Sequence, residues 1–218
     1  MTSAEARLIQ SGARDLGVVL GGEALQRLGR FLALLGVWNR RVRLTGERDP
    51  ETVIRQHALD SLAAVPSIPG AGLVVDIGSG AGFPGIVLGC VRDDLELALI
   101  ESRRRRASFL REAARTIPLP GVRVLEVRAE AAGERELAGR AAAAIARGLR
   151  LDAFLGLAVP LLAPGGVAIA MQTPRAAALA GKTGHDHGLS LTARHDYTLP
   201  GGGARSLLLF RRGEIAVS

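Results

Sequence analysis

The sequence predicts an α/β protein in which a helical segment precedes a mostly parallel sheet that ends in an antiparallel hairpin. Three observations predict this fold. The first 65 residues have helical periodicity, short apolar runs alternate with helical patterns from Leu73 onward, and two strand-like runs flank a Gly-Gly-Gly turn near the end. We expect residues 1–66 to form an N-terminal helical element and residues 67–218 to form the main domain, packed together as one unit.

The N-terminal element is predicted to contain two amphipathic helical segments. Leucines recur at helical spacing from Leu25 to Leu35, with charged residues on the other faces. A second helix is expected to begin at Asp49-Pro50, where a capping side chain precedes a proline in the first turn, and to end before Pro66. Both apolar faces need a partner surface.

The sheet is predicted from strand-like runs that alternate with helical patterns. Such alternation indicates right-handed crossovers, helices on both faces of the sheet, and a ligand crevice at the carboxyl ends of the strands. The parallel strands are expected in LVVDIG (73–78), LELALIE (95–101), VRVLEVR (122–128), AAAAIAR (141–147) and GGVAIAMQ (165–172). The closing hairpin is expected from LTARHDYTL (191–199) and SLLLFRR (206–212).

A glycine-rich run, DIGSGAGFPG over residues 76–85, directly follows the first predicted strand. Alternate glycines allow positive φ and carry no Cβ, so that a cofactor can lie against bare backbone. Glu101 ends the next strand, about where doubly wound folds place an acid for ribose hydroxyls. The dinucleotide pattern fails, because Phe83 takes its sixth position and Pro84 lacks an N–H for a pyrophosphate. The run instead resembles motif I of class I S-adenosylmethionine-dependent methyltransferases, which have a Rossmann-like fold.

A wider resemblance covers residues 37–212. The segments WNRRVRLTGERDP, RQHALDSLAAVP, VVDIGSGAGFPGIVL, ESRRRRASFLRE, RAE, ARGL, LLAPGG and RSLLLFRR resemble, in order and spacing, the bacterial small-subunit ribosomal RNA methyltransferase G family. This family is also named glucose-inhibited division protein B. The resemblance implies transfer of a methyl group from S-adenosyl-L-methionine to N7 of a guanine in the 530 loop of 16S ribosomal RNA. Residues 67–218 would then be the methyltransferase domain.

Site residues follow from the resemblance and from the fold. The resemblance implies that Gly78 and Phe83 line the cofactor, that Ala129 and Glu130 hold its adenine, and that Arg147 contacts it near the reaction centre as the catalytic residue. The fold adds four cofactor-binding residues: Asp76, Gly80, Gly82 and Glu101. We expect Arg105, Arg106 and Arg205 to bind RNA phosphates. A solvated helix start whose arginines pair with Glu101 and Glu112 is the alternative for the run 103–106.

The sequence departs from the family pattern at several of these positions. The family usually has Lys at the position of Arg105, Ala-Phe at Gly148-Leu149, and often Lys-Gly at Gln172-Thr173. Asn often stands at the position of Arg43. The missing lysine at 172 raises the hypothesis that RNA binding is altered.

The absence of an obvious catalytic dyad fits methylation at guanine N7, whose lone pair carries no proton. Methylation of exocyclic amines goes with an Asn/Asp-Pro-Pro-aromatic loop, but the sequence after the fourth strand is ARGL. Carbon-5 chemistry needs a cysteine in the crevice, whereas Cys90 is expected in mid-helix as a core residue. His57 and Asp60 are interpreted as a local hydrogen-bonded pair. The run His185-Asp186-His187 is interpreted as a solvated loop, and no metal is expected.

Composition limits the partners and the compartment. The formal net charge is +7, and 27 of the 28 basic residues are arginine, which favours basic surface patches. The single cysteine, the lack of a secretory signal and the proline-broken apolar stretch 153–174 predict a cytoplasmic protein without a membrane segment, which we expect to be a monomer. Two other interpretations stay open: a methyltransferase for a small molecule or a protein, and a catalytically idle RNA-binding assembly factor.

Overall fold

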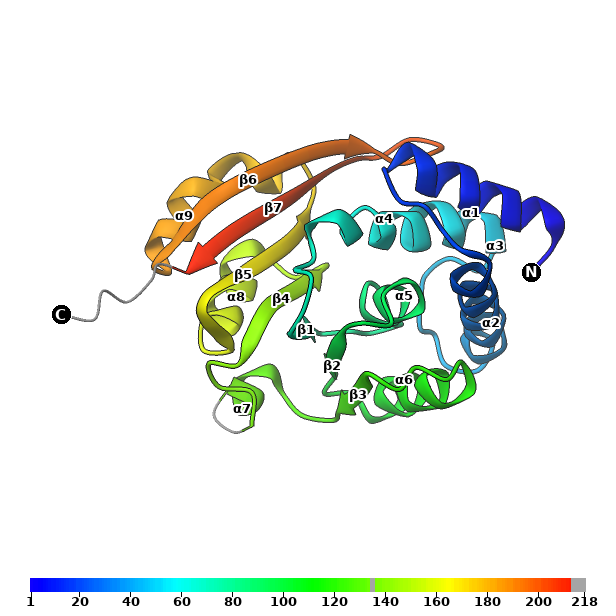
Figure 1. Cartoon of the computed structure of the whole chain (residues 1–218), viewed down its shortest axis with the longest axis horizontal. Helices are drawn as coiled ribbons and strands as arrows, with labels where there is room; N and C mark the ends of the chain where they lie inside the picture. The colour runs from blue at the N-terminus through cyan, green and yellow to red at the C-terminus, as the bar shows by residue number, and fades with distance from the viewer. Residues whose placement is uncertain (134–135, 213–218) are drawn as a thin grey trace.

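The computed structural model describes residues 1–133 and 136–212 (Figure 1). Residues 134–135 and 213–218, which belong to the domain expected over 67–218, lie outside the described residues. The helices are α1 (Ser3–Asp15), α2 (Gly22–Asn39), α3 (Pro50–Val53), α4 (Leu59–Leu62), α5 (Gly85–Val91), α6 (Arg104–Thr116), α7 (Ala129–Gly133), α8 (Leu151–Ala158) and α9 (Ala180–Asp186). A π-helical turn, Ile54–Ala58, joins α3 to α4, and 3₁₀ turns cover Val65–Ser67 and Ala176–Leu179.

The sheet confirms the predicted fold class. Its strands are β1 (Leu73–Ile77), β2 (Glu96–Ile100), β3 (Val122–Leu125), β4 (Ala141–Arg147), β5 (Leu162–Gln172), β6 (Leu189–Thr198) and β7 (Ala204–Arg212). They lie in the order β3-β2-β1-β4-β5-β7-β6. The first five strands are parallel, and β7 runs antiparallel to both β5 and β6. The order reverses at β1, so that β1 and β4 meet at the topological switch point.

Helices cover both faces of the sheet (Figure 1). Helices α7, α8 and α9 lie on one face, and α5 and α6 lie on the other, with the N-terminal helices outside them. Phe31 of α2 and Phe109 of α6 are fully buried in the core that α2, α5 and α6 share. Cys90 is buried in the same core within α5, as expected, and burial raises the pKa of its thiol to about 12.

The chain begins with a helix that the sequence interpretation did not single out. The Thr2 hydroxyl accepts a hydrogen bond from the Glu5 backbone N–H, and the Glu5 carboxylate accepts one from the Thr2 N–H. This capping box satisfies two N–H groups that a helix start otherwise leaves unpaired. Helix α1 therefore has a sequence signal of its own.

Within the described residues, no helix is long and apolar enough to cross a membrane.

Candidate active site

A cleft of about 770 Å³ opens where β1 and β4 end. Ser79, Gly80 and Phe83 line it from the loop after β1, and Arg147 lines it from the end of β4. Leu44, Thr45, His57 and Asp60 of the N-terminal element line it as well. The cleft therefore lies at the place that the doubly wound topology predicts, but the N-terminal element builds part of its wall.

The glycine loop holds its shape through backbone conformations that favour glycine. Gly78, Gly80 and Gly82 have φ of 76°, 56° and 88°. The backbone N–H groups of Gly78 and Ser79 both donate to the Ile100 carbonyl, at 2.9 and 3.0 Å, and this ties the loop to β2. A Cβ at Gly78 would find only Leu149 within 4 Å, at 3.9 Å, whereas one at Gly82 would collide with Ile86. Gly78 thus faces open space, and Gly82 packs inward.

Two buried acids, Asp76 and Glu101, accept hydrogen bonds from the backbone in and beside this loop. The Asp76 carboxylate is 1% exposed and accepts a hydrogen bond from the Gly85 N–H at 3.0 Å, while its Oδ1 is buried without a partner among the described residues. Burial raises the pKa of Asp76 to about 7. Glu101 is 5% exposed and accepts from the backbone N–H groups of Gly80, at 3.1 Å, and Arg103, at 2.7 Å. Both carboxylates hold backbone in place beside the cleft.

Phe83, His57 and Arg147 pack together in the lining of the cleft. The His57 ring stacks on the Phe83 ring with centroids 5.2 Å apart and an interplanar angle of 25°. The Arg147 guanidinium carbon lies 5.4 Å from the centroid of the same phenyl ring. Arg147 also donates to His57 Nδ1 at 2.8 Å, so that the three side chains form one contact group.

His57 is held as a neutral ring between Arg147 and Glu47. Burial and the nearby Arg147 charge lower the pKa of His57, although Glu47 opposes the shift. The Nε2 atom lies 2.7 Å from a carboxylate oxygen of Glu47, and the hydrogen bond to His57 lowers the pKa of that carboxyl. Because Nδ1 accepts from Arg147, the partners assign the proton of the neutral ring to Nε2.

A buried carboxylate, Asp60, lines the cleft and contacts residues of three strands. Its Oδ2 accepts from Arg147 at 3.2 Å and lies 3.6 Å from Nε of Arg205 in β7. Its Oδ1 accepts from the Tyr197 hydroxyl at 2.6 Å, and burial followed by the Asp60 charge raises the pKa of Tyr197. The interpretation of His57 and Asp60 as a local hydrogen-bonded pair is wrong, because each of them contacts Arg147 instead.

The remaining predicted residues lie around this centre. Ala129 and Glu130 begin α7 after β3, half-buried and exposed respectively, and neither lines the cleft. Arg105 is exposed and Arg106 half-buried in the first turn of α6. Within the described residues, neither side chain pairs with Glu101 or Glu112. Glu112 pairs with Arg115 at 2.9 Å, so the alternative pairing for the run 103–106 is wrong.

Gln172 and the histidine run also have defined neighbours. The Gln172 side chain, 9% exposed, donates to the Leu149 carbonyl at 3.0 Å, so that it fastens the loop after β4.

His185 and Asp186 end α9 rather than lying in a loop, and His187 Nε2 lies 3.0 Å from Asp152. No group of three metal-ligating side chains occurs within the described part of the chain.

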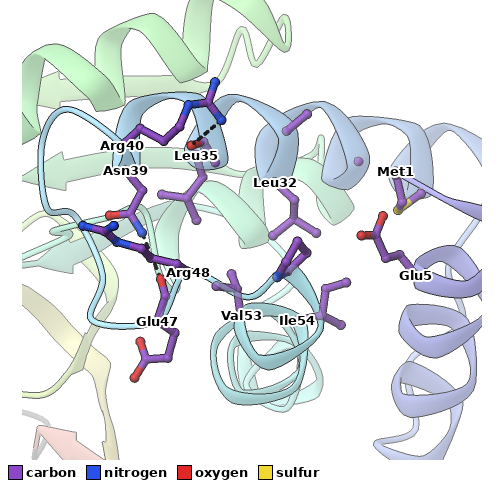
Figure 2. Close-up of a pocket in the computed structure, with 14 residues that line it drawn as sticks. Met1, Glu5, Leu32, Leu35, Asn39, Arg40, Glu47, Arg48, Val53 and Ile54 are labelled. Carbon is purple, nitrogen blue, oxygen red and sulfur yellow. Dashed lines mark hydrogen bonds between the residues drawn. The ribbon is translucent and has the colours of Figure 1, made fainter.

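A second pocket, of about 500 Å³, lies within the N-terminal element (Figure 2). Leu32 and Leu35 of α2 face Val53 and Ile54 across it, and Glu5 of α1 lies at one end. Glu47, Asn39, Arg40 and Arg48 lie at the other end. Since Glu47 also contacts His57, this residue stands between the second pocket and the cleft.

Comparison with known proteins agrees with this geometry. The family model described as GidB, rRNA small subunit methyltransferase G, matches residues 24–186, well over half of the chain. The chain belongs to this family. A relative from Geobacter sp. (strain M21), named ribosomal RNA small subunit methyltransferase G, is 34% identical over 97% of this chain and 100% of its own length. Another with this name, from Chromohalobacter salexigens, is 36% identical over 94% of this chain and 95% of its own length.

Solved structures of other methyltransferases share the fold of this rRNA methyltransferase G family member. A SAM-dependent methyltransferase from Aquifex aeolicus matches with a TM-score of 0.57 at 14% identity, over 74% of this chain and 93% of that one. Precorrin-6y C5,15-methyltransferase from Geobacter metallireducens matches with a TM-score of 0.54 at 14% identity, over 78% and 91%. The expected fold, the family and its S-adenosylmethionine-dependent rRNA methyltransferase activity are thereby confirmed.

Sequence reasoning did not find Glu47, Asp60 or Tyr197 as parts of the site. Their contacts join distant segments: 87 positions separate Asp60 from Arg147, and 137 separate it from Tyr197. A single signal was available in the sequence, namely two polar residues, His57 and Asp60, on one face of a helix otherwise rich in apolar residues. Burying both residues requires partners, and these come from the sheet.

Proposed function

We propose that this protein transfers a methyl group from S-adenosyl-L-methionine to N7 of a guanine in the 530 loop of 16S ribosomal RNA. The observation that carries the proposal is the cleft that Ser79 and Gly80 of the glycine loop line together with the Phe83-Arg147 group. In the proposal, the cofactor wall is the loop over residues 78–82 with Glu101, and the acceptor wall is the group of Phe83, His57 and Arg147 with Asp60. Family membership supports ribosomal RNA as the substrate.

The residues of the cofactor wall fit a nucleoside with a charged sulfur. Gly78 leaves space that a side chain would fill, and each Glu101 oxygen, already bonded to one N–H, keeps a lone pair for a ribose hydroxyl. In the proposal, Gly80, Ala129 and Glu130 complete the ribose and adenine contacts, while Asp76 and Gly82 shape the loop from behind. S-adenosylmethionine, when bound, supplies an electrophilic methyl group.

The acceptor wall provides orientation rather than proton transfer. Guanine N7 carries an in-plane lone pair and no proton, so its attack needs no general base. Arg147, fixed by Asp60 and His57, offers donors at a set position, and the buried Phe83 ring packs against its guanidinium group. Holding the reacting atoms in line can supply roughly 7 to 11 kcal/mol in favourable cases. A neutral His57 is suited to this positioning role.

The test combines cofactor binding with analysis of the product. The purified protein should bind S-adenosylmethionine in a calorimetric titration and should methylate small subunits from a strain that lacks the gene. Mass spectrometry of the 16S RNA should then show one new 7-methylguanosine in the 530 loop. Cofactor binding without any new 7-methylguanosine would overturn the substrate and favour a small molecule or protein as acceptor. RNA binding without cofactor binding would favour an idle assembly factor.

The proposal includes a monomer that acts in the cytoplasm, where ribosomal RNA is processed. The charge of +7 keeps copies of the chain apart and attracts RNA. Light scattering at assay concentrations should give the mass of one chain, 22.8 kDa. A stable dimer would contradict this part of the proposal.

A further inference from the structure

The segment between α2 and α3, residues 40–48, is an ordered loop rich in arginine. We call it the basic loop. Four of its nine residues are arginines, and all four are exposed: Arg40, Arg41, Arg43 and Arg48. The sequence interpretation did not place RNA contacts here.

Asn39, at the end of α2, fixes the conformation of the basic loop. This side chain is 7% exposed. Its Oδ1 accepts from the backbone N–H groups of Leu44, at 2.8 Å, and Thr45, at 3.1 Å. Its Nδ2 donates to the Thr45 hydroxyl at 2.8 Å and to the Glu47 carbonyl at 2.9 Å. One buried amide thus uses both ends to shape the loop, which gives the arginines a fixed scaffold.

The basic loop forms part of the rim of the cleft. Leu44 and Thr45 line the cleft, and the Glu47 carboxylate reaches His57 at 2.7 Å. Figure 2 shows Arg40 and Arg48 beside Asn39 and Glu47, on the side of the loop that faces the second pocket. The four arginines are therefore carried by the backbone that also borders the acceptor wall.

The arginine charges of the loop are not compensated within the described residues. None of the four arginines forms an ion pair there, and Arg40 makes only a 3.4 Å contact with the Gly36 carbonyl. The acids of the neighbourhood are engaged elsewhere: Glu47 bonds to His57, and Asp49 caps α3 through Thr52. Glu51 pairs with Arg55, and Glu5 accepts from the Thr2 N–H. Four exposed guanidinium groups on a backbone of fixed conformation suit a partner with several anionic oxygens.

We propose that the basic loop binds the phosphates of the RNA strand on one side of the target nucleotide. This inference rests on the proposed function and adds to it a surface, separate from Arg105, Arg106 and Arg205, that sets the position of the strand. Phosphate contacts fix the register of a nucleic acid without reading its sequence. Arginines on the ordered loop whose Leu44 and Thr45 line the cleft would therefore hold the strand while the target base enters.

The experiment compares two double variants with equal loss of charge. The test variant, Arg41→Gln/Arg43→Gln, changes the basic loop, and the control, Arg7→Gln/Arg14→Gln, changes two exposed arginines of α1, which contributes nothing to the lining of the cleft. Binding to small subunits is measured over a range of salt concentrations. The plot of log K against log salt has a negative slope. In the test variant this slope should become less steep by about 1.5, and binding should weaken about tenfold, because two phosphate contacts are lost. The control should leave both nearly unchanged.

Asn39→Ala provides a second arm, because it keeps every charge and loosens the loop. We expect this variant to bind RNA about threefold more weakly with a near wild-type salt slope, since the charges remain but lose their fixed positions. Equal slopes for the Arg41/Arg43 and Arg7/Arg14 variants would overturn the inference. Wild-type protein that methylates small subunits in the same assay would show that the proposed function stands even then.

Discussion

The proposed cofactor wall and the proposed acceptor wall of the cleft are built by opposite means. The proposed cofactor wall is mostly backbone: the loop over residues 78–82 takes its form from positive-φ glycines, Glu101 accepts the Gly80 N–H, and Asp76 accepts the Gly85 N–H just after the loop. The acceptor wall is a network of side chains in which Asp60 joins Arg147, Tyr197 and Arg205. The first wall depends on local conformation, and the second depends on the docking of the N-terminal element.

This difference implies different sensitivities to mutation. A backbone wall should fail when a side chain intrudes, and it should tolerate an isosteric change of a supporting carboxylate that keeps the hydrogen bond to the backbone. A side-chain network should lose positioning when one charge is removed, while the fold persists. The variants below test this division, beginning with the largest expected effect.

Asp76→Asn should change how stability depends on pH. The pKa of Asp76 rises from 3.8 to about 7 on folding, so the folded protein holds this proton more tightly and loses stability as pH rises from about 4 to 7. Asparagine cannot titrate, and its carbonyl can still accept the Gly85 N–H. The variant should therefore gain stability relative to wild type between pH 4 and 8, by on the order of 4 kcal/mol. Urea unfolding of the variant and the wild type at pH 4 and at pH 8, without cofactor, measures the gain. A difference in unfolding free energy that is the same at the two pH values would contradict the prediction.

Gly78→Val should abolish most cofactor binding. Its side chain would occupy the open space beside Leu149, a residue that lines the cleft, and we expect at least about 100-fold weaker binding of S-adenosylmethionine, or ~3 kcal/mol. Gly139→Val is the matched control, because Gly139 also has positive φ, 64°, and open space around it, but neither Gly139 nor its chain neighbours line the cleft. Calorimetric titration of both variants measures the effect. An equal loss of affinity in both variants would assign the effect to backbone strain rather than to occupied space. Wild-type affinity in Gly78→Val would contradict the prediction.

Asp60→Asn should impair the acceptor wall and spare the cofactor wall. Without the carboxylate charge, Arg147 and Arg205 repel each other and Arg147 loses its fixed position. We expect the turnover number for methyl transfer to fall about tenfold, or ~1.4 kcal/mol, with little change in S-adenosylmethionine affinity. Ser61→Ala is the control, because it removes a buried hydrogen bond to the His57 carbonyl in the same helical segment. An equal loss in both variants would assign the effect to the helix.

Gln172→Lys should have the smallest effect. The glutamine already fastens the Leu149 carbonyl, and a lysine ammonium could donate to the same oxygen while it adds a charge at the cleft. We expect RNA affinity to rise by a few-fold at most, because one phosphate contact is gained. Binding to small subunits at low salt measures the change. Unaltered affinity would remove the hypothesis that the missing lysine weakens RNA binding.

The sequence predicts the cofactor wall because its signals are local. The glycine spacing, the strand before it and Glu101 at the end of the next strand lie within 29 residues, and short-range rules suffice to interpret them. The proposed acceptor wall has no such signal: the partners of Asp60 come from β4, β6 and β7, so they depend on how α4 packs against the sheet. The local interpretation of His57 and Asp60 was therefore wrong, although Arg147 was correctly expected at the end of β4. The capping box of α1, formed by Thr2 and Glu5, has a local sequence signal, but the sequence interpretation did not use it.

Cys90 gives the chain an internal reporter. It is the only thiol in the sequence, and it lies in the core that unites α2, α5 and α6. Because the sulfur is shielded and its pKa is about 12, an alkylating reagent can attack it only after this core opens. The rate of carbamidomethylation of Cys90 therefore reports how often this core opens. The measurement uses the unmutated protein and needs no added dye. Ligands that bind across the cleft should slow that rate in proportion to how firmly they hold the two walls together.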